Sequence, residues 1–145
     1  MTSNSQFAVA IHVLCVLGVL EEMGEKHVSS RQIAVSVNTN AVVIRNLVSL
    51  LKEAGLVSSK EGKGGGLKLS KSPVKISLQD IYVAVACNDS LLGLSKRAEF
   101  KQCSVSCGMK KILPPIFEEV DRAVEKSLKG RTLKSVMEAL VHSNV

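Results

Sequence analysis

Three stretches near the start of the chain carry apolar side chains at helical spacing. Residues 6–22 are almost all apolar or small, which predicts a largely buried first helix that ends at Gly24. Two shorter amphipathic patterns, over residues 30–37 and 41–54, each predict a helix with one buried face. Because a turn of about three residues separates them, the second and third helices form a helix-turn-helix signature.

The polar residues around these helices have the identities of helix caps. Ser29 and Gln32 have the spacing of a capping box, which satisfies two amides at a helix start. Asn38 tolerates a left-handed backbone and can close the second helix, and Asn40 can cap the third. Gly55 supplies the C-terminal stop of the third helix.

A β-hairpin is predicted directly after the third helix, which makes the unit a winged helix. Alternating residues at 56–59 and 67–69 flank a glycine-rich turn. The run Gly64-Gly65-Gly66 could also suggest a phosphate-binding loop, but such a loop opens into a helix, and here a strand follows. A wing tip that needs positive φ is the better interpretation.

After the wing the pattern returns to helix and then loses its period. Pro73 closes the wing, and Ser77 caps a fourth helix that runs through Ala86. Residues 87–108 have no clean periodicity and hold three of the four cysteines, so we interpret them as a loop, with one irregular helical turn near residues 91–94.

The last part of the chain predicts two helices. From about Met109 the apolar positions recur every four residues, which predicts a long amphipathic helix that ends at Gly130. Pro114 and Pro115 lie inside this pattern and mark either the start of the helix or a kink. Thr132 then caps a final helix.

The expected fold is mainly α with a small β-hairpin. Residues 1–86 form a winged helix-turn-helix DNA-binding domain, residues 87–108 a cysteine-bearing sensor loop, and residues 109–145 a dimerisation helix with a final packing helix. The long helix is too apolar on one side to stand alone, so either a second copy covers it or it folds back on its own chain. We favour the symmetric dimer, which would place two recognition helices on a palindromic site.

Composition places the chain in the cytoplasm. Of its 145 residues 46% are hydrophobic, which favours a folded core over disorder. The longest apolar stretch, residues 7–20, is short of the roughly 20 residues that a membrane span needs. Residues 1–6 contain no Lys or Arg, so the start of a signal peptide is not expected.

The positive charge is concentrated where DNA contact is expected. The net charge is +6, and residues 44–75 hold seven basic side chains against two acidic ones. This distribution points to double-stranded DNA as the partner, with the third helix in the major groove and the wing along the backbone. The alternative is a winged helix that docks on a protein and regulates it without touching DNA.

Individual residues can be assigned to this interface. Arg45 can bind guanine bidentately and Asn46 can pair with adenine, while Lys52, Lys60 and Lys63 can neutralise phosphates. The full predicted set is Asn40, Ala41, Val42, Arg45, Asn46, Ser49, Lys52, Lys60, Lys63 and Gly64.

The cysteines are the other candidate site. Cys15 is interpreted as a core residue, whereas Cys103 and Cys107 lie near a helix start with Lys101, Lys110 and Lys111 close by, a setting that favours the reactive thiolate. Cys87 could fold back to the same place. Plain semi-buried thiols, thiol sensing of an oxidant and metal or iron–sulfur ligation all remain open. A closed zinc site would need four ligands, and only these three cysteines, with no nearby His, are on offer.

No catalytic constellation is evident, so an enzyme is not predicted. The three histidines are scattered, and no Cys-x-x-Cys occurs.

The segment 29–85 resembles the bacterial winged-helix repressor family that includes the regulators IscR, NsrR and CymR. The marks of the resemblance are the Ile33-Ala34 pair, the Asn40 cap, the exit from Leu51 to Leu56, the Gly64-Gly65-Gly66-Leu67 wing and residues 76–81. The resemblance implies a homodimeric DNA-binding transcriptional regulator.

The loop departs from the cluster-binding members of this family. They carry three cysteines within about a dozen residues, whereas only Cys103 and Cys107 fall in the matching segment here. This departure disfavours an iron–sulfur cluster and indicates a cluster-free member that answers an oxidant or small-molecule signal. We expect Cys107, which comes just ahead of Gly108 and the long helix, to be the sensor, with Cys103 as the candidate resolving partner.

Overall fold

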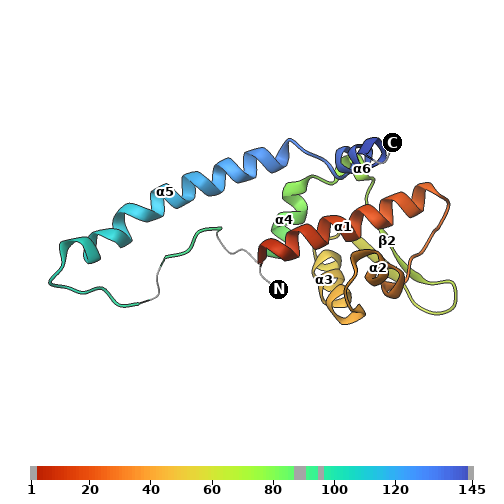
Figure 1. Cartoon of the computed structure of the whole chain (residues 1–145), viewed down its shortest axis with the longest axis horizontal. Coiled ribbons are helices and arrows are strands. Elements are labelled where there is room, and N and C mark those ends of the chain that lie inside the picture. Colours follow the sequence, from red (N-terminus) through yellow and green to blue (C-terminus); the bar gives the residue numbers. More distant parts are fainter. Residues whose placement is uncertain (1–2, 87–90, 95–96, 144–145) are drawn as a thin grey trace.

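The computed structural model describes residues 3–86, 91–94 and 97–143 and is mainly helical with one two-stranded antiparallel sheet. In chain order the elements are α1 (Ser3–Glu22), α2 (Ser30–Val37), α3 (Ala41–Glu53), β1 (Val57–Lys60), β2 (Gly66–Leu69), a 3₁₀ turn (Pro73–Lys75), α4 (Leu78–Ala86), α5 (Ser104–Lys129) and α6 (Leu133–Ser143). All elements except α5 form a body, from which α5 projects as an arm (Figure 1). The expected winged helix-turn-helix with a long C-terminal helix is confirmed.

Helix α1 is the central helix of the body. Ala10, Val13, Leu14 and Leu17 are at most 1% exposed, because α1 packs against α2, α3, α4, α6 and β2. By length and composition the segment Ser5–Glu22 could also cross a membrane, and this apolar stretch is longer than the sequence pattern indicated. In the structure its apolar side chains are instead part of the core of the body.

The helix-turn-helix forms through the local caps that the sequence predicts. The Ser29 hydroxyl accepts from the amide of Gln32 at 3.2 Å, and the Gln32 carbonyl oxygen Oε1 accepts from the amide of Ser29 at 2.8 Å. Asn38 adopts the left-handed conformation with φ 61°, and Asn40 Oδ1 accepts from the amide of Val43 at 3.0 Å. The axes of α2 and α3 consequently differ by 110°, which is typical of this motif.

The wing is fixed to the body by a third extended segment. The Val28 amide donates to the carbonyl of Leu67 at 2.9 Å, and the Leu67 amide donates to the carbonyl of Val28 at 2.7 Å. This pairing brings the Val28 backbone against Gly66, whose φ is 142°. A side chain at position 66 has no room, which explains why a glycine stands at the base of the wing.

Replacing Gly66 with Ala is expected to destabilise the fold by about 2–4 kcal/mol. The new Cβ would lie 2.8 Å from the Val28 carbonyl oxygen, in a backbone conformation that L residues rarely adopt. Urea unfolding followed by circular dichroism measures the change. The control is Gly108→Ala in α5, where the Cβ meets only Ile112 Cδ1 at 3.9 Å, so stability should rise by up to about 1 kcal/mol. Equal midpoints for the two variants would contradict the strained contact.

The start of α5 differs from the sequence expectation. The helix begins at Ser104 with Cys103 as its N-cap, so the prediction of a loop through residue 108 and a helix from about Met109 is wrong. Residues 91–92 form a bend and residues 93–94 have no regular secondary structure, so the irregular helical turn expected there is also wrong.

The two prolines of α5 lie within the helix. Because α5 runs through Pro114 and Pro115 without a break, the alternative in which the helix starts at Pro114 is wrong. Each proline removes the amide that would bond to the carbonyl four residues earlier, at Lys110 and Lys111. Those residues are exposed on a projecting helix, so water can satisfy the freed carbonyls.

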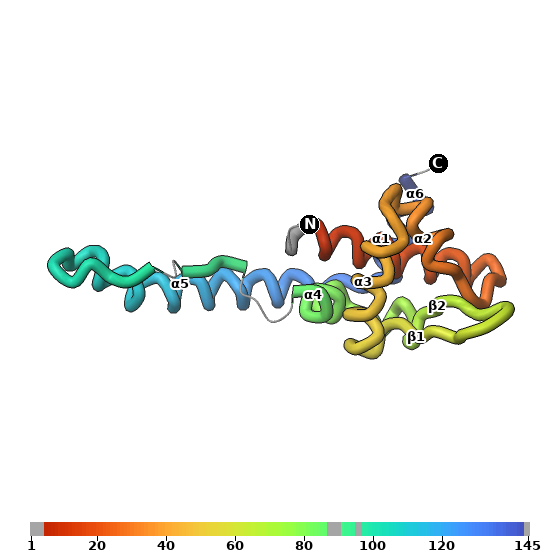
Figure 2. Tube along the Cα trace, turned by 90° about the horizontal axis from the view of Figure 1, so that it is seen from below, coloured from red at the N-terminus to blue at the C-terminus, as the bar shows by residue number. Residues whose placement is uncertain are grey.

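Backbone hydrogen bonds between described residues join the arm to the body at the C-terminal end of α5. The Leu78 amide donates to the carbonyl of Arg131 at 2.9 Å, and the Leu133 amide donates to the carbonyl of Ile76 at 2.8 Å. These bonds fix the α5–α6 corner beside α4 (Figure 2). None of the residues of α5 is buried, and Ile112 is 57% exposed. The Ile112 face of α5 is therefore not packed against the body, whereas Leu128 packs against the core and the Leu91 amide donates to Asp121 at 3.3 Å.

Candidate nucleic-acid interface

Helix α3 presents a polar face because its apolar face is held in the core. Ile44, Leu47, Val48 and Leu51 are buried. The opposite positions Val42, Arg45, Asn46 and Ser49 are exposed, and their spacing of three, four and seven residues places them on one face. The structure thus brings together the side chains that the sequence assigns to base contacts.

Two predicted residues at the start of α3 have a structural part as well. The Asn40 side chain is engaged as the helix cap, since its Oδ1 accepts from the Val43 amide. Ala41 is half-buried and packs against the core. Both residues therefore help to position the first turn of α3. Asn40 is exposed like Arg45 and Asn46, whereas Ala41 is partly buried.

Lys52 connects the end of α3 to the wing. Its Nζ donates to the hydroxyl of Ser59 on β1 at 2.7 Å, and both side chains are exposed. This contact places an ammonium group in the junction between helix and hairpin. Lys63 and Gly64 lie further out, on an exposed tip where Gly64 has φ 77° and Gly62 has φ 88°.

The hairpin register adds a basic residue that the predicted site omitted. Lys68 pairs with Ser58, and Lys60 lies two residues further along β1 on the same face. Leu67 and Leu69 point the other way and are buried, so Lys60 and Lys68 share the outward face of the wing. The alternation Leu67-Lys68-Leu69 was the signal in the sequence that could have identified Lys68.

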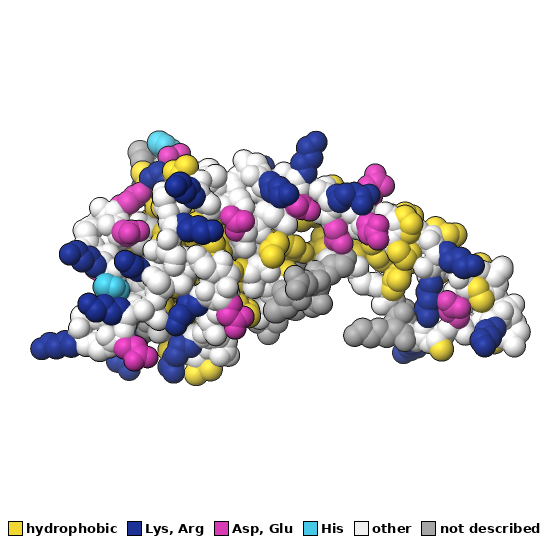
Figure 3. Space-filling view, turned by 180° about the vertical axis from the view of Figure 1, so that it is seen from behind, with side chains coloured by type: hydrophobic (Ala, Val, Ile, Leu, Met, Phe, Trp, Pro, Cys, Tyr) yellow, Lys and Arg dark blue, Asp and Glu magenta, His cyan; other side chains and the backbone are white. Residues whose placement is uncertain are grey.

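Among the described residues, no ion pair neutralises the positive charge of this surface. In the described parts of the chain, the ion pairs join Lys110 to Glu99, Lys129 to Glu125 and Lys134 to Glu22. None of them involves a basic residue of the 44–75 segment. Lysine and arginine side chains are spread over the body in Figure 3, whereas apolar side chains gather along the arm.

The cysteines of the arm lie at the first turn of α5. The Cys107 sulfur is 3.7 Å from the carbonyl oxygens of both Phe100 and Lys101, and the Ser106 hydroxyl accepts from the Phe100 amide at 2.8 Å. The segment before the helix is therefore folded onto its first turn. Cys103 and Cys107 are both partly exposed, while Cys87 lies outside the described residues.

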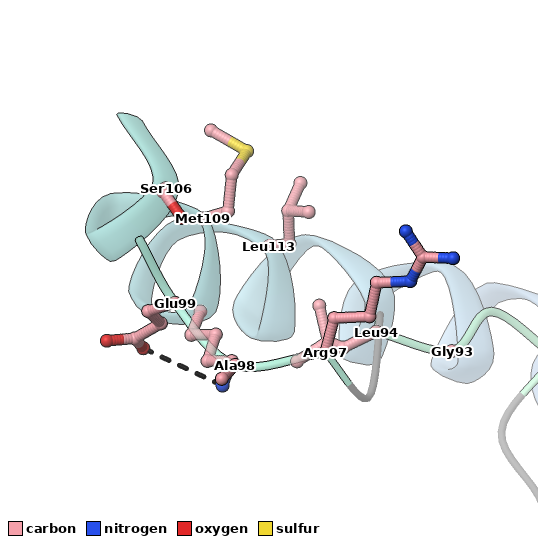
Figure 4. Close-up of a pocket in the computed structure, with 9 residues that line it drawn as sticks. Gly93, Leu94, Arg97, Ala98, Glu99, Ser106, Met109 and Leu113 are labelled. Atoms are coloured by element: carbon pink, nitrogen blue, oxygen red, sulfur yellow. Dashed lines mark ion pairs between the residues drawn. The ribbon is translucent and has the colours of Figure 1, made fainter. Parts of the chain in front are cut away.

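A pocket of about 350 Å³ lies beside this turn (Figure 4). Leu94 and Ala98 of the loop and Met109 and Leu113 of α5 line it, together with the Lys110–Glu99 ion pair of 3.8 Å. It thus belongs to the same part of the arm as the two cysteines.

Cys15 is a core residue, as the sequence predicts. It is 5% exposed within α1, and burial raises the pKa of its thiol to about 11. A thiol that stays protonated at neutral pH is a poor nucleophile, so Cys15 is not a candidate sensor.

Comparisons with known proteins agree with this geometry. Over residues 3–139 the chain matches the family described as Rrf2, iron-dependent transcriptional regulator. The chain belongs to the Rrf2 family. The protein YwnA of Bacillus subtilis (strain 168), named as an HTH-type transcriptional regulator, is 42% identical over 137 residues, which cover 94% of this chain and 98% of YwnA.

Solved structures show the same fold. One described as a DNA-binding protein is 37% identical, with a TM-score of 0.70 over 91% of this chain and 98% of the other. IscR from T. potens is 24% identical, with a TM-score of 0.68 over 96% of this chain and 88% of IscR. The family resemblance is confirmed, and this Rrf2 chain is a DNA-binding transcriptional regulator and not an enzyme.

The family description names iron, and the described donor set does not fit a metal centre. Within residues 3–86, 91–94 and 97–143, no three His, Cys, Asp or Glu side chains come together at metal-binding distance. Cys103 and Cys107 provide two thiols at the start of α5, whereas an iron–sulfur cluster takes about four protein ligands.

Proposed function

We propose that this Rrf2-family chain is a cytoplasmic, homodimeric repressor that binds a palindromic operator in double-stranded DNA. The observation that carries the proposal is the positive charge on α3 and the wing, which no ion pair neutralises among the described residues, together with the exposed base-reading side chains of α3. Bound over a promoter, such a dimer would exclude the polymerase.

Each group on this face has a defined part in the proposal. Arg45 reads guanine, Asn46 reads adenine and Val42, which is 58% exposed, contacts a thymine methyl group. The ammonium groups of the wing and of the end of α3 neutralise phosphates on both sides of the groove; they belong to Lys52, Lys60, Lys63 and Lys68.

Fluorescence anisotropy with DNA from upstream of the chain's own gene tests this function. With about eight phosphate contacts from two protomers, affinity should fall by about 10³–10⁵-fold between 50 and 200 mM salt. Binding that ignores salt, or no binding to any promoter fragment, would contradict the proposal.

We further propose that Cys103 and Cys107 form a switch that needs no metal. Hydrogen peroxide would take two electrons and two protons from the two thiols, which leaves a disulfide and two water molecules. Cys103 is the N-cap of α5 and Cys107 lies in its first turn, with the Cys107 amide bonded to the Cys103 carbonyl at 3.1 Å. A disulfide would fix the two Cβ atoms about 3.5–4.5 Å apart. We expect this constraint to rearrange the first turn of α5, and the segment that Cys107 and Ser106 hold would move with it.

Mild peroxide is expected to weaken operator binding of the wild type at least about tenfold and to leave Cys107→Ser unaffected. The same anisotropy assay, before and after treatment with a thiol reductant, measures the change. Cys15→Ala is the control and should respond like the wild type, and Cys87→Ser decides whether Cys87 is the resolving partner instead of Cys103. A response that persists in Cys107→Ser, or the absorption of an iron–sulfur cluster in anaerobically purified protein, would contradict this switch.

A further inference from the structure

A second pocket lies in the body, away from the polar face of α3 and from the arm. It has a volume of about 370 Å³, is lined by three helices and is open to solvent. Its lining includes His12, Cys15 and Val16 of α1, Gln32 and Ser36 of α2, and Leu140 of α6.

The polar side chains of this pocket gather at one place. His12 Nε2 and Ser36 Oγ share a hydrogen bond of 3.0 Å between α1 and α2. Gln32 also lines the pocket, but its Oε1 is engaged in the capping box with Ser29. The pocket therefore offers one polar corner, formed by the imidazole of His12 and the hydroxyl of Ser36.

The remaining walls are apolar. Cys15 is 5% exposed, and Val16, Val19 and Leu20 of α1 lie beside it. Leu140 on α6 is 44% exposed, which leaves the pocket open to solvent on that side. None of the lining residues is Asp, Glu, Lys or Arg.

These features define the chemistry of an occupant. The volume is at the small end of ligand pockets, which suits a molecule of one or two rings. The lining holds no Asp, Glu, Lys or Arg that would pair with an ionised group, and its walls are mainly apolar, so an uncharged molecule fits it best. The polar corner matches a single hydroxyl, which can both donate to and accept from these side chains.

We propose that this pocket binds a small uncharged aromatic molecule with one hydroxyl group and that occupancy weakens operator binding. The lining connects two parts of the regulator: α2 leads through the Asn38–Asn40 turn into α3, and α6 is continuous with the arm. A molecule wedged between α2 and α6 moves the helix-turn-helix relative to α5. The regulatory half of this inference rests on the proposed operator binding, and the ligand-binding half does not.

Three probes of one shape test the ligand-binding half: 1-naphthol, naphthalene and 1-naphthoate. Titration of the full chain by equilibrium dialysis should give one 1-naphthol site per chain. Naphthalene, which lacks the hydroxyl, should bind roughly three- to tenfold more weakly. The anion 1-naphthoate should bind at least about tenfold more weakly than 1-naphthol.

Variants place the site. Ser36→Ala should weaken 1-naphthol to the level of naphthalene and leave naphthalene unchanged. Leu140→Ala should weaken both probes about fivefold. The control Val141→Ala, at a neighbouring residue that is 63% exposed and outside the lining, should change neither.

The outcomes separate the two halves of the inference. Equal affinity for the three probes, or no effect of Ser36→Ala on 1-naphthol binding in folded protein, overturns the proposed ligand site. If a monomeric variant binds 1-naphthol and the wild type does not, a second copy of the chain occupies the pocket in the wild type. This result also overturns the proposed ligand site. With binding established, saturating 1-naphthol should raise the operator Kd at least about fivefold, and an unchanged Kd overturns the regulatory half. Absence of operator binding without any probe refutes the proposed function and leaves the dialysis result for the pocket standing.

Discussion

Replacing Arg45 with Glu is expected to weaken operator binding at least about 100-fold while the fold is kept. A good bidentate contact to a base contributes about 1–3 kcal/mol, and a dimer loses it twice. The new carboxylate also repels the nearby phosphates. Arg45 is exposed on α3 and has no ion-pair partner within the described chain, so its removal leaves no buried charge behind.

Fluorescence anisotropy at one salt concentration measures the loss, and circular dichroism checks the fold. The matched control is Arg131→Glu, which makes the same change of charge at the exposed α5–α6 corner, on the opposite side of the body from α3 in Figure 1. It should cost less than about fivefold, because only the long-range attraction to DNA is reduced. Equal losses in the two variants would mean that net charge alone drives binding. If the Arg45→Glu variant keeps its operator affinity, α3 does not bind in the major groove. That result would favour the alternative in which the winged helix docks on a protein.

Local rules explain why the helix-turn-helix was predictable. The positions of Ser29, Gln32, Asn38 and Asn40 each satisfy or release backbone groups within four residues, so the sequence carries the whole of that information. The apolar period of α3 likewise indicates which side faces DNA, because burial of one face dictates exposure of the other.

The start of α5 was missed because its first turn has weak local signals. Ser104, Ser106 and Gly108 interrupt the apolar period, and Pro114-Pro115 is itself a typical helix start. The helix extends upstream because the Phe100 segment packs onto its first turn.

Contacts between distant segments were beyond any local pattern. The hydrogen bond from His12 to Ser36 and the packing of Met137 against Gly18 join helices that are far apart in the chain. The 370 Å³ pocket arises from the same packing of α1, α2 and α6, so no sequence motif predicts it. Long-range packing of this kind depends on how whole helices stack and not on residue spacing.

Replacing both Ile112 and Ile116 with Asp is expected to convert the proposed dimer to a monomer. The two side chains are 57% and 49% exposed, and Val105 and Met109 extend the same apolar stripe along α5. At 1.5 Å per residue the helix is about 39 Å long, enough for two copies to pair side by side. Burial of each Ile contributes about 1.5–3 kcal/mol, and a carboxylate in its place has to be desolvated without a partner.

Analytical ultracentrifugation measures the oligomeric state, and the dimer dissociation constant should rise by more than about 10³-fold. Lys111→Asp with Arg122→Asp is the matched control, since these exposed positions lie on another face of α5 by helical geometry. It adds two carboxylates to the same helix and should leave the dimer intact.

Operator binding connects the dimer to the proposed function. A monomer contacts one half-site, so the Ile112→Asp, Ile116→Asp variant should lose at least about 100-fold in operator affinity and show roughly half the salt dependence of the wild type. A variant that becomes monomeric yet keeps full operator affinity would contradict the palindromic operator. A variant that remains dimeric would show that the dimer interface lies elsewhere. The exposed apolar stripe of α5 would then require a different partner.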